Sequence, residues 1–349
     1  MSCSVPTRTP APTEAAAAAG WWSDTLISVL AAYVAEFHPD NPLAGLVVAD
    51  RPAPEAPEGW ALVDVRAAAL NHHDVWSLRG VGLKSEQLPM ILGCDAAGVD
   101  QDGNEVLLHA VISSPGWIGE QTLDPRRSLL SERHQGTLAE QVVVPTANLV
   151  PKPSGLSFEE AACLPTAWLT AYKMLCINGG PPGSTVLVQG AGGGVASAAI
   201  ALGSALGYRV WATSRDESRR QRALDLGADA VFESGQRLPE RVDIVLETVG
   251  AATWSHSVSS LRPGGTVVIA GATSGDAPPR AELTRIFFQQ MRVQGSTMGN
   301  LEQLQQVVRV VEQTGVRPLI DRVLPLSQAA DGIAALHAGE VFGKVVLTP

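Results

Sequence analysis

Residues 186–196 read Val-Leu-Val-Gln-Gly-Ala-Gly-Gly-Gly-Val-Ala, an apolar run that leads into a glycine cluster. The segment 197–206 that follows favours a helix, so the order is strand, tight turn and helix. Glycine lets the backbone at such a turn approach a phosphate closely, and the first N–H groups of the helix favour an anion. A second strand is expected at 209–213, which completes a βαβ unit. The pattern therefore predicts a dinucleotide-binding turn.

The turn departs from the usual glycine pattern. Aligned on Gly193, Gly194 and Val195, the outer glycines are replaced by Ala191 and Ala196. A glycine cluster alone is weak evidence, because many such clusters are ordinary structural turns. The surrounding order of strand, helix and strand favours nucleotide binding over that alternative.

Strands and helices alternate through the second half of the chain. The apolar runs predict strands at 186–190, 209–213, 230–232, 242–246, 266–270 and 293–295, and helices at 195–206, 216–226 and 252–261. This alternation predicts a doubly wound parallel sheet. Upstream of it, a capping-box spacing at Ser157 and Glu160 opens a helix over 159–164, and a second helix is expected over 167–177.

Both ends of the chain have a different pattern. Residues 30–150 contain short strand candidates at 31–37, 46–49, 60–69 and 141–145, separated by turn residues, with a long surface excursion at 113–136. The tail predicts a helix at 301–314, then a strand, a helix at 327–338 and a strand at 343–348. Because the tail lies beyond the alternating unit, we expect it to return to the first domain.

Composition excludes several classes of protein. The 349 residues are 45% hydrophobic and 17% charged, with a formal charge of −10, which argues against a nucleic-acid binder. No apolar run reaches membrane-spanning length, and the first residues lack the pattern of a signal peptide. The four cysteines form no C-x-x-C pair and suggest reduced thiols. We expect a cytoplasmic protein with a disordered extension at residues 1–28.

Several segments, taken in order, carry a family resemblance: Ala69–Trp76, Leu92–Gly98, Gly136–Glu140, Leu164–Tyr172, the glycine turn and Gly295–Gly299. Their combination resembles the medium-chain dehydrogenase/reductase superfamily, and within it the zinc-free quinone oxidoreductase-like branch. The resemblance implies an α/β protein with a GroES-like β-rich catalytic domain (29–154 and 300–349) and a Rossmann NADP(H)-binding domain (155–299). The active site would lie in the cleft between the two domains.

The resemblance also raises the question of zinc. A catalytic zinc needs three protein ligands. The corresponding positions hold Asn71, Cys94 and Thr166, and Asn and Thr are poor zinc ligands. His72 and His73, if in a strand, would point to opposite faces. We therefore expect no metal, and we interpret Cys94 as a small buried side chain.

The residues at the end of the strand expected at 209–213 indicate which coenzyme is preferred. NAD-specific folds place an acid there, but this chain has Ser214, followed by Arg215 and then Arg219. Since guanidinium groups suit phosphate, we expect NADPH; the alternative is a solvated helix face. The remaining cofactor-binding candidates are Thr170, Ala191, Gly192, Gly193, Gly194, Val195, Gly271 and Ala272. Lys344 either reaches the cofactor or is exposed, and we expect exposure.

Catalysis without zinc needs another group to stabilise negative charge on the acceptor oxygen. The resemblance implies Asn71 as an amide donor, although capping a turn is an equal alternative. Trp76 would stack on a flat acceptor or pack as a core or lid residue, Thr166 would line the pocket, and Asp74 would be structural. No general acid stands out, so solvent would supply the proton.

We therefore expect a zinc-independent NADPH-dependent oxidoreductase that transfers hydride to a quinone or α,β-unsaturated carbonyl. One alternative is an enoyl-thioester reductase, for which Arg126 and Arg127 are the only hint of a basic channel. Another is a non-catalytic NADPH-binding sensor or scaffold. The partner would be a small molecule, with no nucleic acid and no membrane. Because 266–270 and 293–295 would lie toward an open edge of the sheet, the resemblance implies a homodimer paired there.

Overall fold

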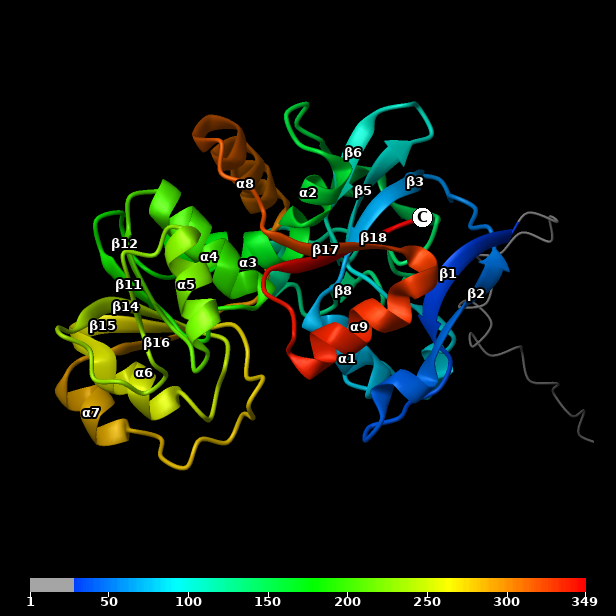
Figure 1. The fold of residues 1–349 in the computed structure, drawn as a ribbon. Coiled ribbons are helices and arrows are strands. Elements are labelled where there is room, and N and C mark those ends of the chain that lie inside the picture. Colours follow the sequence, from blue (N-terminus) through cyan, green and yellow to red (C-terminus); the bar gives the residue numbers. More distant parts are fainter. Residues whose placement is uncertain (1–27) are drawn as a thin grey trace, which may run out of the picture.

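The computed structural model describes residues 28–349, so the expected extension at residues 1–28 lies outside the described part except for Ser28. Two units lie side by side (Figure 1). Four helices lie where the units meet: α2 (Phe158–Ala162), α3 (Leu169–Tyr172), α4 (Gly194–Ala205) and α8 (Leu301–Thr314). Strands from both ends of the chain lie in the first unit, where β18 (Lys344–Thr348) pairs with β3 (Trp60–Ala69) and with β17 (Ile320–Pro325) (Figure 1).

The first unit is built from mostly antiparallel strands. One sheet has the order β2-β1-β4, and a larger one has the order β10-β6-β5-β3-β18-β17, with β9 also paired to β3. Along β3 the residues Ala61, Val63 and Val65 are buried while Asp64 and Arg66 are exposed, the alternation of a half-buried strand. The strands are β1 (Ser28–Val34), β2 (Leu46–Pro52), β3 (Trp60–Ala69), β4 (Met90–Ile91), β5 (Asp95–Asp100), β6 (Glu105–Leu108), β9 (Gln141–Pro145), β10 (Leu149–Pro151), β17 (Ile320–Pro325) and β18 (Lys344–Thr348), with β7 (Val111–Ile112) and β8 (Ser128–Leu129) as a separate pair.

The second unit is a six-stranded parallel sheet with the order β13-β12-β11-β14-β15-β16. The doubly wound architecture is confirmed, and β11 is buried through Val186, Leu187 and Val188 because such strands are covered on both faces. The strands are β11 (Thr185–Val188), β12 (Arg209–Thr213), β13 (Ala230–Phe232), β14 (Val242–Glu247), β15 (Leu261–Ile269) and β16 (Arg292–Gly295). The helices are α4 (Gly194–Ala205), α5 (Glu217–Asp225), α6 (Trp254–Ser260) and α7 (Leu283–Phe288).

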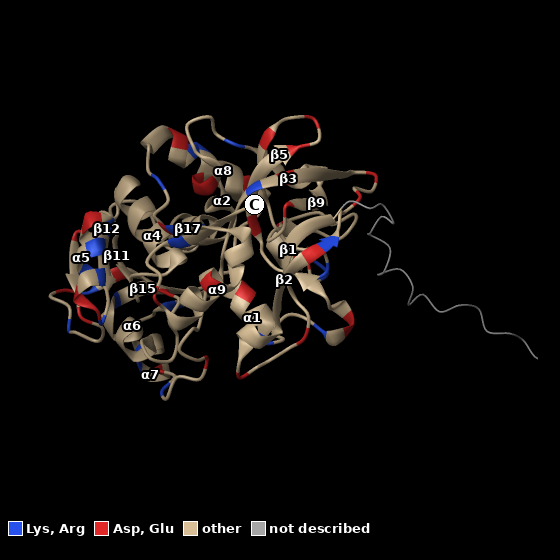
Figure 2. Ribbon diagram, turned by 45° about the vertical axis from the view of Figure 1, so that its right-hand side comes forward, with Lys and Arg blue, Asp and Glu red and all other residues tan. Residues whose placement is uncertain are grey.

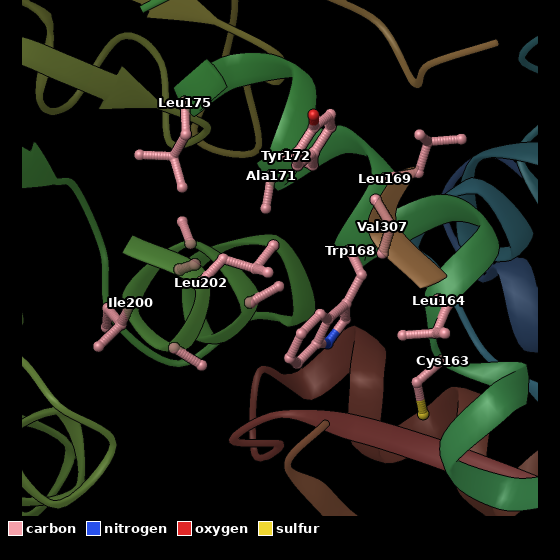
Figure 3. Close-up of a cluster of buried hydrophobic side chains, with 14 of the residues drawn as sticks. Cys163, Leu164, Trp168, Leu169, Ala171, Tyr172, Leu175, Ile200, Leu202 and Val307 are labelled. Carbon is pink, nitrogen blue, oxygen red and sulfur yellow. The ribbon is translucent and has the colours of Figure 1, made fainter. Parts of the chain in front are cut away.

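A helical segment between the units carries much of the core. It begins with α2 (Phe158–Ala162), capped as expected by Ser157, whose Oγ accepts the Glu160 N–H at 3.2 Å. The helix expected over 167–177 forms, but with α3 (Leu169–Tyr172) between two π-helical segments, Leu164–Trp168 and Lys173–Ile177. Its buried side chains, Trp168 among them, lie beside Leu202 of α4 and Val307 of α8 (Leu301–Thr314) (Figure 3).

Since α8 packs with α3 while β17 and β18 join the first sheet, we propose that the boundaries 29–154, 155–299 and 300–349 hold with α8 as an element shared by both units.

One local expectation is wrong. His72 and His73 do not lie in a strand, because residues 72–78 form helix α1 (His72–Leu78). The Asn71 N–H donates to Asp74 Oδ2 at 2.8 Å, and the Asp74 N–H donates to the Asn71 carbonyl at 3.0 Å. This reciprocal capping starts the helix and brings both imidazoles to one cavity.

Acidic and basic side chains are interspersed over both units (Figure 2). In the described range, no helix has the length and apolar character that crossing a bilayer requires. The last helix, α9 (Ala329–Ala338), lies against α1 and leads into the segment that returns to the site.

Candidate active site

A cavity of about 490 Å³ lies where the two units meet. One wall comes from α1 and β18 of the first unit, and the other from the glycine turn and the loops that follow β14, β15 and β16. In open parallel sheets, ligands bind at the carboxyl ends of the strands, and these loops leave those ends. The cavity therefore has the location expected for a coenzyme and an acceptor side by side.

The glycine turn is held open toward the cavity. The Gly190 N–H donates to Thr213 Oγ1 at 3.3 Å and the Ala191 N–H to the Thr213 carbonyl at 2.7 Å, so β12 fixes the turn from below. A Cβ on Gly190 would lie 2.6 Å from Val249, whereas a Cβ on Gly193 would meet nothing within 4 Å. Gly193 is the N-cap of the twelve-residue helix α4, whose first N–H groups have no partner within the helix. This cradle fits a dinucleotide phosphate.

A buried polar network supports the turn, and the sequence analysis missed it. Gln189 Oε1 accepts from Thr213 Oγ1 at 2.7 Å, and its amide donates to Ser257 Oγ at 3.0 Å. Glu247, 1% exposed, accepts the N–H groups of Val249 and Gly250 at 2.8 and 3.0 Å. Both residues directly follow or end buried parallel strands, which is the sequence signal that could have found them.

The arginines near Ser214 divide into two groups. Ser214 is buried, and its carbonyl accepts from Arg220 Nη1 at 2.8 Å, while Arg215 is exposed beside it. Arg219 lies elsewhere: it donates to the Gly339 carbonyl, and a Cβ on Gly192 would lie 2.7 Å from its Nη1. Arg219 thus lies on the glycine turn rather than at Ser214. The position beside Ser214 that was expected for Arg219 is occupied by Arg220.

Asn71 belongs to the opposite wall, but its side chain does not cap the helix. Asn71 Nδ2 donates to Asp95 Oδ2 at 2.8 Å and to the Ala69 carbonyl at 3.3 Å. Its Oδ1 accepts from Lys344 Nζ at 2.7 Å. The helix is capped instead by Asp74, whose other oxygen accepts the Gly93 N–H at 3.0 Å; burial raises the pKa of this carboxyl group. Asp74 therefore has a structural position.

Lys344 is not exposed, contrary to the sequence-based expectation. It is 3% exposed, and its ammonium group donates to the Leu70 carbonyl at 2.7 Å and to Asp95 Oδ2 at 3.3 Å as well as to Asn71. Its stem passes the glycine turn, because a Cβ on Gly194 would lie 2.9 Å from Lys344 Cδ. The preceding Gly343 N–H donates to the Gly192 carbonyl at 2.8 Å. One short segment therefore joins the turn to Asn71.

The remaining wall combines apolar side chains with the hydroxyl group of Thr166. Thr166 lies in a π-helical segment, and its buried Oγ1 has no hydrogen-bond partner among residues 28–349. π-Helical turns are frequent at functional sites, and a hydroxyl group without a protein partner is free to bind a ligand. Trp76 lines the same cavity with the Arg79 guanidinium 5.1 Å from its ring centroid. Leu129 and Met298 complete this side.

Most of the predicted site residues meet at this cavity. Its lining includes Asn71, Trp76, Thr166, Thr170, Gly193, Gly194, Val195, Arg219, Gly271 and Ala272. Ala191, Gly192, Ser214 and Arg215 lie outside the lining, although the first two belong to the turn itself. Lys344, His72 and His73 also line the cavity and were not on the predicted list. Desolvation, with the nearby charge of Lys344, lowers the pKa of His72.

The donor set does not fit a catalytic zinc. Within the described chain, no three His, Cys, Asp or Glu side chains gather closely enough to hold a metal ion. Cys94 Sγ donates to the Leu130 carbonyl at 3.3 Å, and burial raises the pKa of its thiol well above the usual value.

Known proteins match both units. The family described as "Alcohol dehydrogenase GroES-like domain" matches residues 57–154, and the one described as "Zinc-binding dehydrogenase" matches residues 194–313. The probable acrylyl-CoA reductase AcuI of Escherichia coli is 33% identical, covering 68% of this chain and 74% of its own. The 2-methylene-furan-3-one reductase of Solanum lycopersicum is 30% identical, covering 85% and 73%.

Two solved structures are similar throughout. That of an NAD-dependent alcohol dehydrogenase has a TM-score of 0.84 at 37% identity, covering 92% of this chain and 99% of that one. That of the 2-octenoyl-CoA carboxylase reductase CinF, in complex with NADP and 2-octenoyl-CoA, has a TM-score of 0.83 at 26% identity, covering 92% and 87%.

Proposed function

The chain belongs to the medium-chain dehydrogenase/reductase superfamily, and from this premise we propose that it is a zinc-independent, NADPH-dependent reductase of α,β-unsaturated carbonyl compounds or quinones. The observation that carries the proposal is the shared cavity, which is lined on one side by the glycine turn and on the other by Trp76, Leu129 and Met298. A flat apolar acceptor would fit between them.

The coenzyme site fits a nicotinamide dinucleotide phosphate. The glycine turn and the N-terminus of α4 would hold the pyrophosphate, with Arg219 beside it. Ser214, Arg215 and Arg220 would hold the 2′-phosphate, because no carboxylate replaces the serine. Thr170, Gly271 and Ala272 would line the nicotinamide end. When bound, the reduced coenzyme supplies the hydride.

The acceptor wall would orient and polarise the substrate. Trp76 would pack against its flat face, and the unpartnered Thr166 hydroxyl would donate to its carbonyl oxygen. Asn71, Lys344 and Asp95 would form a fixed, hydrogen-bonded corner of this wall, in which the carboxylate balances the charge of the lysine. The relative from Solanum lycopersicum, named as a 2-methylene-furan-3-one reductase, favours this substrate class because its named substrate is an α,β-unsaturated ketone.

An enoyl-thioester reductase is a second candidate. Two similar proteins are named for acyl-CoA substrates, the probable acrylyl-CoA reductase and CinF. Arg126 and Arg127 remain the candidates for a basic contact with the phosphate groups of such a substrate, and both are exposed. The chemistry at the double bond would be the same, so the two candidates differ only in how the acceptor is anchored.

An acceptor screen tests the proposal. Purified protein, dialysed against EDTA and assayed for zinc, should oxidise NADPH with enones or quinones faster than with aldehydes. Preference for enoyl thioesters would select the second candidate. Turnover that disappears on chelation and returns with added zinc would contradict the zinc-independent mechanism, and NADPH oxidation with none of these acceptors would contradict the activity itself.

A further inference from the structure

The acceptor side of the cavity also contains a titratable side chain from α1, that of His73. His73 lines the cavity, and its Nε2 lies 3.1 Å from Ser131 Oγ and 3.5 Å from Ser77 Oγ. Ser131 is completely buried, and its Oγ also lies 3.6 Å from Cys94 Sγ, another cavity residue. The imidazole is therefore fixed at one nitrogen by a buried hydroxyl group while the ring borders the acceptor space.

Ser131 holds this position at a conformational cost. Its φ is +65°, in the left-handed region that residues with a side chain seldom adopt. The surrounding structure maintains it, since the Ser131 N–H donates to the His134 carbonyl at 2.8 Å. Backbone strain of this kind collects at functional sites. Here the strained residue is the one that presents its hydroxyl group to His73.

Resting on the reductase function proposed above, we propose that His73 is the proton donor to the substrate carbon and that Ser131 is its positioning residue. Hydride addition to the β-carbon of an enone leaves an enolate. An N–H bond of the imidazolium breaks, the proton forms a C–H bond at the α-carbon, and the neutral imidazole is reprotonated from solvent. Imidazole is the side chain that most often acts as a general acid, whereas burial raises the pKa of the Cys94 thiol well above its usual value.

The stereochemistry of the product tests this role. An enone substituted at its α-carbon is reduced in D₂O, and the two product enantiomers are separated. The parent protein should give one enantiomer, because a fixed donor delivers the deuteron to one face. His73→Gln should lower the enone kcat on the order of 100-fold and give both enantiomers, because solvent reaches either face.

Quinone reduction separates this step from hydride transfer. A hydroquinone takes its protons on oxygen, where exchange with solvent is fast, so His73→Gln should slow quinone reduction far less than enone reduction. NADPH affinity, measured by fluorescence titration, should change little. The matched control is His38→Gln, since His38 lies outside the cavity and away from Ser131. This control should retain both activities and a single enantiomer.

Ser131→Gly keeps the proposal testable if His73→Gln folds poorly. Glycine accepts a φ of +65° without strain, so the variant should fold, yet it removes the hydroxyl group that fixes His73. It should yield a mixed product. A single enantiomer and an unchanged enone kcat in both variants would overturn the role of His73. A parent protein that reduces neither enones nor quinones would instead overturn the proposed function on which the role depends.

Discussion

Lys344 and Asn71 lie 273 positions apart in the sequence, yet Lys344 Nζ is 2.7 Å from Asn71 Oδ1. The contact joins the last strand of the chain to the first residue of the acceptor wall, and Asp95 closes it from a third segment. Because Gly343 binds the glycine turn, the same segment aligns the coenzyme side of the cavity with the acceptor side. Hydride transfer depends on such alignment.

Replacing Lys344 should destabilise the protein. Lys344→Met leaves the fully buried Asp95 without its cation, and breaking a buried pair in this way costs about 3–5 kcal/mol in the free energy of unfolding. Urea denaturation measures the change. The exposed Lys84→Met serves as the control and should stay within about 0.5 kcal/mol of the parent. Lys344→Met/Asp95→Asn should recover part of the loss, and equal stability of Lys344→Met and the control would refute the buried pair.

The two groups of arginines should have different effects on coenzyme binding. Arg215→Ala and Arg220→Ala should each weaken NADPH by roughly 1.5–3 kcal/mol and leave NADH nearly unchanged. Arg219→Ala should weaken both coenzymes, because Arg219 lies on the glycine turn. Fluorescence titration of each variant, with the exposed Arg237→Ala as control, measures these affinities. Equal affinity of the parent protein for NADPH and NADH would contradict the assignment of the 2′-phosphate site.

Stability should fall on acidification because of His109. Burial lowers the pKa of His109 to about 4, against the opposing effects of Gln121 and Glu120. Because the unfolded chain takes up this proton more readily than the folded protein, neutral His109 contributes to the free energy of unfolding. This contribution is fully present above pH 6.5, the pKa of the unfolded chain, and is lost as the pH falls toward 4. Between pH 7 and pH 5 this amounts to about 2 kcal/mol.

Urea denaturation at both pH values should show that loss in the parent and a smaller one in His109→Gln. The variant His38→Gln should lose as much free energy of unfolding between the two pH values as the parent does. If His109→Gln also loses the same amount, the buried histidine is not the source of the pH dependence.

Assembly should occur at the edge of the parallel sheet. Strand β16 ends the sheet with exposed residues, and the neighbouring helix α7 exposes Leu283, Phe287 and Phe288. We propose that a second copy of the chain covers them, giving a homodimer. Light scattering at micromolar concentration should report a dimer for the parent and a monomer for Phe287→Asp/Phe288→Asp. The control Ile118→Asp, at an exposed apolar site in the other unit, should remain dimeric, whereas a monomeric parent would refute the interface.

Local patterns predicted much of the second unit. The segment β11, the glycine turn, α4 and β12 was predicted because each part depends on neighbours within about 30 residues. Helix α1 was missed although its signal is local, since Asn71 and Asp74 have the spacing of a capping pair. The glycine content of the turn indicated a phosphate site, and its contacts with Thr213 follow from the parallel pairing of β11 and β12.

The positions that depend on distant contacts could not be predicted. Lys344 looks like an ordinary polar residue at the start of a strand, and the partners of its buried ammonium group, Asn71 and Asp95, lie 273 and 249 residues away. Arg219 and Arg220 are adjacent on α5, and only their contacts separate them. Arg219 donates to the Gly339 carbonyl and Arg220 to the Ser214 carbonyl. The strained φ of Ser131 has no sequence signal, because serine rarely adopts that conformation.

We propose that this cavity brings a nicotinamide coenzyme and an unsaturated acceptor together for direct hydride transfer. The most direct test uses NADPH deuterated at the transferable C4 position, an enone and metal-depleted protein, with mass spectrometry of the product. We predict one deuterium atom at the β-carbon for each NADPH consumed. Oxidation of NADPH without deuterium in the product, or no saturated product at all, would contradict the account.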